Sequence, residues 1–377
     1  MATAKERFSL KDHLFNPETI EQLAQEFGAG IPSFDGTRFE SEALAGFAGR
    51  ELLQRLEWMA DCLETQLASD FPTMADQLET AMPKMLNPTF SDGDFGHFIH
   101  AVPGVLAVRH GLEYHRERAL DLLYEATKRF SMEFYIRPFL NLWPDETLAR
   151  LSLWVQDENY HVRRLVSEGT RPRLPWAKSV TLTQEQNISF LDALHADIAR
   201  FVTRSVANHM NDISKINADI VVSLLSDWKK QGLQSVKELD WMTHHSLRTL
   251  VKQGHLGALE LLGYSKDVPV SVDARILTPI VMMDDAVSFE ITISAQTQCP
   301  VLVDYRIEFV RANGRRSEKV FKLKQGKVGP SLPLNLKKVH KLKADATTVT
   351  FFEGAHHITI QVNGVDHTVL DFQLTSN

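Results

Sequence analysis

The segment HVRRLVSEG at residues 161–169 indicates how the first two thirds of the chain fold, because its pattern recurs. Similar helical segments follow as VTRSVANHMND at 202–212 and SLRTLVKQG at 246–254. Their shared arginines, 40 and 44 residues apart, are Arg164, Arg204 and Arg248. Intervals of roughly 40–47 residues are typical of HEAT or armadillo units, in which stacked helix pairs form a curved solenoid. We therefore predict an all-α HEAT-like-repeat solenoid with one concave face.

The first copy lies within WVQDENYHVRRLVSEGTRPRLPW, residues 154–176, where basic residues gather. Residues 160–178 contain five Lys and Arg residues against one acid, Glu168, although the whole chain has a formal net charge of −7. Apolar residues at helical spacing predict a short helix over Tyr160–Ser167, which Gly169 ends. Two X-Pro pairs hold the following residues extended. Glu168 then either forms a salt bridge that orders a loop or places its carboxylate against a cationic substrate on a phosphate backbone.

The rest of residues 10–265 also reads as nearly all helix. Glu51–Leu67 and Glu113–Phe130 are amphipathic and contain no proline or glycine. Helix starts are visible as well, because short polar side chains that accept hydrogen bonds from backbone N–H groups precede several of these patterns. The predicted caps are Asp145, Thr183 in a capping box with Gln186, and Asn217 before a helix over Ala218–Lys229.

After Gly263 the chain changes to short alternating runs rich in Val, Ile, Phe and Thr. The runs lie at 268–276, 286–295, 301–310, 319–324, 347–352 and 356–362. Such runs at roughly ten-residue spacing indicate an antiparallel, all-β sandwich, immunoglobulin-like in shape. Turn signals that fit its hairpins lie at 284–285, 313–316 and 363–366. We therefore predict two domains, 1–267 and 268–377.

Composition places the chain among ordinary soluble globular proteins, with 44% apolar and 24% charged residues. Its two cysteines, Cys62 and Cys299, are far apart and have no partner at metal-ligand spacing, so we expect reduced thiols. The first residues lack the apolar core of a signal peptide, and no apolar run is long enough to span a membrane. We expect a cytoplasmic protein with no metal and no cofactor.

Positive charge is concentrated in the sandwich region. Residues 305–343 contain twelve Lys and Arg residues but only two acids, Glu308 and Glu318. A local excess of this size fits a surface that contacts phosphates. The alternative is a set of solvated strand faces and loop tips.

Four runs of the helical part resemble the bacterial DNA alkylation repair glycosylases of the AlkC type, which belong to the HEAT-like-repeat superfamily that also contains AlkD. These runs are FSLKDHLFNPETIEQLA (8–24), RFSMEFYIRPFLNLW (129–143), NYHVRRLVSEGTRPRLPWA (159–177) and SVANHMNDISK (205–215). The resemblance covers most of residues 8–265. The sandwich is similar to the immunoglobulin-like domain that some AlkC proteins carry at the carboxyl end.

This resemblance implies excision of cationic N3-alkylated bases, such as 3-methyladenine and 3-methylcytosine, from duplex DNA, without flipping the base into a protein pocket. Such a base already carries positive charge and leaves easily, while the sugar becomes oxocarbenium-like. The enzyme contributes negative charge near that cation and a positioned water. The implied partner is double-stranded DNA containing alkylated bases, bound by a monomer that does not contact membranes. The alternative function is a non-catalytic HEAT-type scaffold for nucleic acid or protein.

The resemblance assigns catalysis to Glu133, Glu168 and Asp212. If the repeats stack as predicted, the three carboxylates fall near helix boundaries in successive units and line one concave face. Each has a structural alternative: a surface residue for Glu133, a salt bridge for Glu168, and a cap or turn for Asp212.

The residues expected to contact DNA flank these acids and continue into the sandwich. Arg164, Arg171 and Lys215 are expected to hold phosphates beside the lesion, and Trp176 either packs against a deoxyribose or belongs to the core. The full predicted DNA-binding set is Arg164, Arg171, Arg173, Trp176, Lys215, Arg315 and Arg316.

Overall fold

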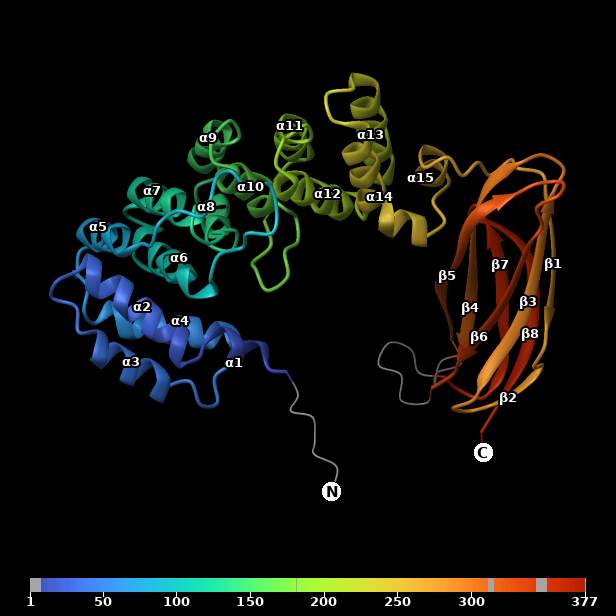
Figure 1. Ribbon diagram of the computed structural model, residues 1–377, viewed down its shortest axis with the longest axis horizontal. Helices are drawn as coiled ribbons and strands as arrows, with labels where there is room; N and C mark the ends of the chain where they lie inside the picture. Colours follow the sequence, from blue (N-terminus) through green and yellow to red (C-terminus); the bar gives the residue numbers. More distant parts are fainter. Residues whose placement is uncertain (1–7, 181, 311–314, 344–350, 377) are drawn as a thin grey trace. The chain divides into compact units, whose positions relative to one another are not determined.

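The computed structural model describes residues 8–180, 182–310, 315–343 and 351–376 (Figure 1). These residues form two compact units. The first comprises the described residues up to Asp212 together with Leu233–Glu238, and the second comprises Ile213–Gly232 and the described residues from Leu239 onward. The predicted change from helix to strand is confirmed, since the last helix ends at Leu261 and the first strand begins at Val270. The domain boundary at 267/268 stays a prediction, because helices before it belong to the second compact unit.

The first unit is helical, and Figure 1 shows its helices following one another in packed pairs. Its elements are α1 (Leu10–Leu14), α2 (Pro17–Gly30), α3 (Gly36–Ala45), α4 (Leu52–Glu64), α5 (Phe71–Ala81), η1 (Phe98–Ala101), α6 (Val102–Leu106), η2 (Ala107–Gly111), α7 (Arg116–Thr127), α8 (Ile136–Leu142), α9 (Pro144–Trp154), α10 (Tyr160–Gly169), α11 (Gln184–Leu194) and α12 (Arg200–Ser214), whose last two residues belong to the second unit. Helix α7 contacts α5, α8 and α10, and α10 contacts α9 and α11. This stacking of neighbouring pairs is the predicted HEAT-like solenoid.

The helix boundaries follow capping chemistry. Thr183 and Gln186 form the predicted capping box of α11, and the Asn217 side chain accepts the predicted bond from Ile220 N. The cap predicted at Asp145 is wrong. Helix α9 begins one residue earlier at Pro144, because proline is pre-set for the first helical position, and Asp145 lies inside the first turn. The two amphipathic segments form α4 and α7, each a few residues shorter than predicted.

A long connection without regular helix precedes η1 and reaches α12. Backbone N–H of Phe201 donates to the carbonyl of Ser91 at 2.8 Å, and Asp92 pairs with Arg204 at 2.7 Å. The ring of Phe95 meets that of Phe201 edge to face, with centroids 5.2 Å apart. The segment is therefore fixed to α12 by a backbone bond, an ion pair and an aromatic contact.

The second unit combines three helices with a β-sandwich. Its helices are α13 (Ala218–Gln231), α14 (Val236–Lys252), whose first residues belong to the first unit, and α15 (Leu256–Leu261). Its strands are β1 (Val270–Ile276), β2 (Ile280–Met282), β3 (Ala286–Ala295), β4 (Cys299–Val310), β5 (Arg316–Val328), β6 (Leu334–Lys341), β7 (Gly354–Val362) and β8 (Val365–Thr375). One sheet has the order β1-β3-β6 and the other β2-β8-β7-β4-β5.

The core of the sandwich is built from the inward positions of both sheets. Phe289 of β3, Tyr305 of β4 and Ile360 of β7 belong to one buried cluster. The β7–β8 hairpin turns through Asn363 and Gly364, which have φ values of 51° and 79°. Asparagine followed by glycine suits this left-handed turn, so the signal at 363–366 is confirmed.

Some details of the sandwich differ from the sequence expectation. Pairing is antiparallel throughout the named strand pairs except between β2 and β8, which run parallel. Strands β2, β6 and β8 were not predicted. The run at 347–352 lies outside the described residues up to position 350, and its last two residues form no strand. Half of the turn signal at 313–316 also falls outside the described part. Among the described helices, none is long and apolar enough to cross a membrane.

Candidate active site

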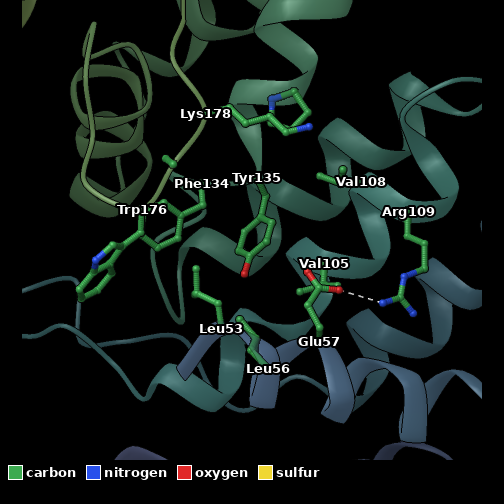
Figure 2. A pocket seen from close by; sticks show the side chains of 12 residues that line it. Leu53, Leu56, Glu57, Val105, Val108, Arg109, Phe134, Tyr135, Trp176 and Lys178 are labelled. Atoms are coloured by element: carbon green, nitrogen blue, oxygen red, sulfur yellow. Dashed lines mark hydrogen bonds and ion pairs between the residues drawn. The ribbon is translucent and has the colours of Figure 1, made fainter. Parts of the chain in front are cut away.

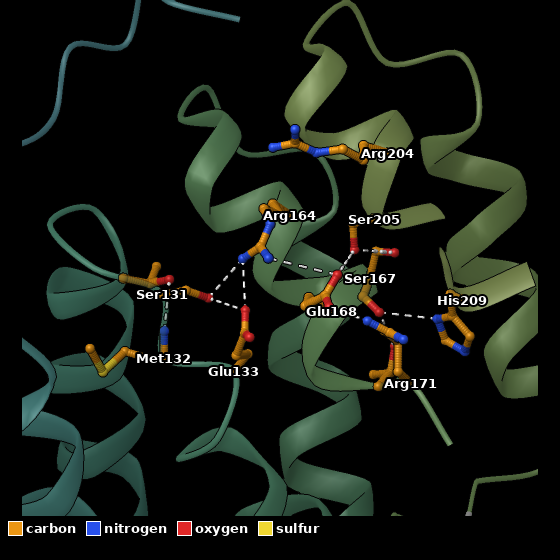
Figure 3. Close-up of polar contacts among 12 residues, drawn as sticks. Ser131, Met132, Glu133, Arg164, Ser167, Glu168, Arg171, Arg204, Ser205 and His209 are labelled. Carbon is orange, nitrogen blue, oxygen red and sulfur yellow. Dashed lines mark hydrogen bonds and ion pairs between the residues drawn. The ribbon is translucent and has the colours of Figure 1, made fainter. Parts of the chain in front are cut away.

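The three predicted carboxylates lie in one polar network of the first unit. Figure 3 shows Glu133 and Glu168 beside Arg164 and Arg171. Glu133 is in the turn before α8, Glu168 is the penultimate residue of α10, and Asp212 is near the end of α12. Arg164 donates to Glu133 at 2.8 Å and lies 3.7 Å from Glu168. Arg171 pairs with Glu168 at 2.5 Å and with Asp212 at 2.7 Å. Two guanidinium groups thus join three carboxylates from three successive parts of the solenoid.

Helix α10 orients its acid and its arginine by its amphipathic pattern. Asn159 caps its start by accepting from His161 N at 2.9 Å. Its apolar residues are buried, which leaves Arg164 and Glu168, one turn apart, on a shared face. A Cβ added at Gly169 would lie 2.5 Å from Ile136 Cγ2, so glycine permits close packing on α8.

Helix α12 supplies a second stripe of polar groups. Ser205, His209 and Asp212 follow each other at four and then three residues, which places them on one helix face. The Ser205 hydroxyl donates to Glu168 Oε2 at 2.6 Å. His209 Nδ1 lies 3.0 Å from the carbonyl oxygen of Ser167, so we infer that this nitrogen carries the proton. The stripe therefore holds both the carboxylate and the backbone at the end of α10.

The charges of this network are fixed by each other. Burial by itself would raise the pKa of Glu168, but the Arg164 and Arg171 charges and the Ser205 hydrogen bond outweigh it and lower that pKa. Burial also opposes the charge on Arg164 and Arg171, yet the neighbouring carboxylates keep the pKa of both above the ordinary value. Burial, reinforced by the Arg171 charge, lowers the pKa of His209 to about 4, so this imidazole is neutral at physiological pH.

Arg137 holds the segment that follows α10. Its fully buried guanidinium donates to the carbonyl oxygens of Gly169 at 2.9 Å, Arg171 at 2.8 Å and Lys178 at 2.5 Å. Burial, with the nearby Arg171 charge, lowers the pKa of Arg137 to about 10, so the group remains charged at neutral pH. This arginine fixes the path of residues 169–178 and with it the position of Arg171.

Glu133 opens onto a pocket of about 250 Å³. The pocket is lined by Phe95, Phe98, Phe130, Ser131, Glu133, Phe134, His161, Arg164, Trp176 and Phe201. The Arg164 guanidinium lies 4.3 Å from the centre of the Phe201 ring, and the Ser131 hydroxyl donates to Glu133 at 2.8 Å. A carboxylate at an aromatic surface suits a flat or cationic group, because aromatic faces also attract cations.

A second pocket of about 340 Å³ shares Phe134 and Trp176 with the first (Figure 2). Figure 2 shows Tyr135, Leu53 and Glu57 around it, with Glu57 paired to Arg109 at 2.9 Å. Trp176 is 68% exposed and has a φ of 66°, a left-handed conformation that a tryptophan rarely adopts. Its predicted alternative as a core residue is therefore wrong.

The predicted DNA-binding residues fall into two groups. The guanidinium groups of Arg164 and Arg171 are buried against carboxylates, and their predicted phosphate contacts stay a prediction. The others are exposed, although Arg316 also pairs with Glu308; they are Arg173, Trp176, Lys215, Arg315 and Arg316. Lys215 belongs to the second unit.

Sequence reasoning missed several members of the network, namely Ser131, Arg137, Ser205 and the aromatic residues of the pocket. The sequence did contain one signal for Ser205. It precedes Asp212 by seven residues, about two helical turns, so both side chains lie on one helix face. Nothing local in the sequence indicates that Arg137 meets backbone carbonyls more than thirty residues away.

The solved structure of Pseudomonas fluorescens alkylpurine DNA glycosylase AlkC bound to DNA containing an abasic site analog matches this chain with a TM-score of 0.82. Sequence identity is 30%, and the match covers 98% of this chain and 100% of that chain. The chain belongs to the AlkC family. The chain is also similar to the Bacillus subtilis (strain 168) "Uncharacterized protein YhaZ", with 29% identity over 369 residues that cover 96% of this chain and 98% of that protein.

The sandwich has a family match of its own. Residues 271–376 match the family model described as "Uncharacterised protein YhaZ, C-terminal Ig-like domain". The AlkC assignment therefore covers both parts of the predicted architecture, a helical-repeat solenoid followed by an immunoglobulin-like sandwich.

Proposed function

We propose that the chain is a DNA glycosylase of alkylation repair, which excises cationic N3-alkylated bases such as 3-methyladenine and 3-methylcytosine from duplex DNA. Membership of the AlkC family supports the activity. The observation that carries the proposal is the fixed network of three carboxylates and two guanidinium groups, which opens onto an aromatic pocket through Glu133. The network has one negative charge in excess. The further positive charge of Arg137 is directed at backbone carbonyls.

The chemistry requires little from the protein beyond electrostatics. When the glycosidic bond breaks, its electron pair leaves with the cationic base, which becomes neutral. The sugar C1′ becomes oxocarbenium-like, a water adds to it, and loss of a proton gives an abasic site. Negative charge that is fixed before the reaction stabilises this cation without reorganisation.

The geometry suggests different roles for the acids. Glu133 lines the pocket and retains some exposure, so we propose that it faces the sugar and holds the attacking water. Glu168 and Asp212 are 4% and 7% exposed, and we propose that they supply charge from behind and fix Arg164 and Arg171. These arginines then act as positioning residues for the carboxylates.

Lesion choice follows from the same electrostatics. We propose that the base is released without insertion into a base-specific pocket, so that selectivity follows positive charge and the lability of the glycosidic bond. No cofactor enters this scheme. No lysine is among the described residues that line the Glu133 pocket, which supports a monofunctional reaction without a Schiff base.

The exposed members of the predicted set are proposed to contact the duplex. Arg173 and Trp176 lie on the segment that Arg137 fixes, and Trp176 lines the Glu133 pocket. Arg315 and Arg316 are exposed on the sandwich. We propose that these groups bind phosphates or sugars and that the chain acts as a monomer.

The test is incubation with duplex DNA that contains 3-methyladenine, scored by release of the free base. We expect base release with an intact strand at an alkali-labile abasic site. Strand cleavage with an adduct trapped by borohydride would contradict the monofunctional mechanism. Tight DNA binding with no release of any N3-methylated base would favour the non-catalytic scaffold.

A further inference from the structure

The second unit contains a pocket of about 300 Å³ that the proposed catalytic function does not use. It lies among α14, the connection from α15 to β1, and strands β4 and β5. The lining residues are His244, Arg248, Val251, Lys252, Leu262, Tyr264, Leu302, Asp304, Val320, Lys322 and Gln325.

The pocket exists because helical residues cover the outer face of β4. Val303 and Tyr305 point into the sandwich core, so Leu302 and Asp304 point the opposite way. Both are nevertheless buried, with exposures of 2% and 8%. The outer face of this strand is therefore one wall of the pocket.

Basic residues from two different elements converge on this pocket. His244, Arg248 and Lys252 are spaced four residues apart on α14, which places them on one helix face. Lys322 comes from β5, where it is the register partner of Asp304 next to a β-bulge. Asp304 is the acid among the lining residues, against two lysines, one arginine and one histidine.

The polar wall on the sandwich side is held in place by hydrogen bonds. Lys322 Nζ donates to Gln325 Oε1 at 2.7 Å, and Gln325 Nε2 donates to the Tyr264 hydroxyl at 2.7 Å. Burial raises the pKa of Asp304 to about 6, although the Lys322 charge opposes this rise, so most of this carboxyl is ionised at neutral pH. One carboxylate against one arginine and two lysines leaves a net positive lining.

We propose that this pocket seats one phosphate of the DNA backbone, held by Arg248, Lys252 and Lys322, with its deoxyribose against apolar residues such as Val251 and Leu302. An arginine offers paired donors to phosphate oxygens, and a lysine acts as a point charge. The proposal rests on DNA being the partner, as in the proposed function. It adds that α14 and the sandwich form a single phosphate site, so neither binds that phosphate alone.

The experiment measures binding of an undamaged duplex by fluorescence anisotropy between about 50 and 200 mM salt. Each seated phosphate contributes about 0.9 to the slope of log affinity against log salt. We expect the double variant Lys252→Gln/Lys322→Gln to lower the slope by about 0.9 and to weaken binding several-fold. The matched control Lys229→Gln/Lys230→Gln, which changes two exposed lysines of α13 outside the pocket and outside the basic region 305–343, should leave both unchanged.

A second variant protects the test from a folding defect, because loss of Lys322 leaves Asp304 without its cation. Lys252→Glu reverses an exposed charge on α14 and should weaken binding more than Lys252→Gln does. An unchanged slope in Lys252→Glu and in the folded double variant would overturn the proposal. So would micromolar binding of inorganic phosphate by calorimetry with unchanged DNA affinity in the variants, since the pocket would then take a small free anion.

The undamaged duplex separates this proposal from the catalytic one. If the slope falls as expected but 3-methyladenine is never released, the phosphate site stands and the glycosylase proposal fails. If the base is released and the slope does not change, the reverse holds.

Discussion

Replacing Glu168 by glutamine removes the charge of the most buried carboxylate of the network while it keeps the shape of the side chain. Glu168 is 4% exposed and accepts from Arg171 at 2.5 Å and from Ser205 at 2.6 Å. Removing one partner of a buried ion pair costs about 3–5 kcal/mol when the other charge is left alone. Here Arg171 retains Asp212. We therefore expect the free energy of unfolding to fall by roughly 2–3 kcal/mol, below that range.

The pH dependence of this loss has a definite sign. The pKa of Glu168 is lowered in the folded protein, so its carboxylate stabilises the fold above the unfolded pKa of about 4.3. That contribution disappears as the pH falls through the lower pKa that Glu168 has in the folded protein. The difference in unfolding free energy between Glu168 and Glu168→Gln proteins should therefore be full at pH 7 and shrink below about pH 4.

Urea unfolding at several pH values measures the loss of stability. Single-turnover excision of 3-methyladenine at saturating enzyme measures the effect on catalysis. We expect excision to slow by about 10²-fold while DNA binding is retained, because a charge that stabilises the transition state is lost. An unchanged single-turnover rate constant in the folded variant would refute this reasoning and leave Glu168 as a structural salt bridge.

Further predictions test the other parts of the structure. Glu133→Gln should slow excision by about 10²-fold. Its unfolding free energy should stay within about 1.5 kcal/mol of the parent, because Glu133 is less buried than Glu168. Equal loss of stability in Glu133→Gln and Glu168→Gln would contradict this. A duplex containing the neutral lesion 1,N6-ethenoadenine should release little base, and efficient release would require a base-specific pocket. Gly169→Ala should lower the unfolding free energy by about 1–3 kcal/mol through contact with Ile136, measured by urea titration. Arg315→Gln/Arg316→Gln should reduce the salt slope of duplex binding but leave saturated excision unchanged; an unchanged slope would show that these residues do not bind phosphate.

Much of the fold could be predicted because its signals are local. The recurring arginine helices, the capping box at Thr183 and the Asn363–Gly364 turn each depend on a few neighbouring residues. Strand β6 was missed since its inward positions include His340 and Lys338, which break the apolar alternation. The cap at Asp145 failed because proline competes for the start of the helix one residue earlier.

The site was only partly predictable, since its partners are distant in sequence. The family motifs indicated which acids to consider, and the charge pattern placed Glu168 among arginines. The pairing of Arg171 with Asp212 spans 41 residues and depends on how α10 and α12 dock, which no local pattern contains. The sequence does not show whether Arg164 pairs with a carboxylate or with a phosphate, because an arginine near an acid in the chain can take either partner.

The network also links catalysis to partial unfolding of the solenoid. Its hydrogen bonds between different helices and turns join residues 31 to 42 positions apart, in neighbouring repeats. In a repeat protein, stability is approximately the sum of each repeat and its nearest-neighbour interfaces, so ends can detach while the middle remains folded. Detachment of α12 would remove Ser205 from Glu168 and Asp212 from Arg171 while most helices persist. Under mild denaturant, activity should therefore vanish before helical circular dichroism does.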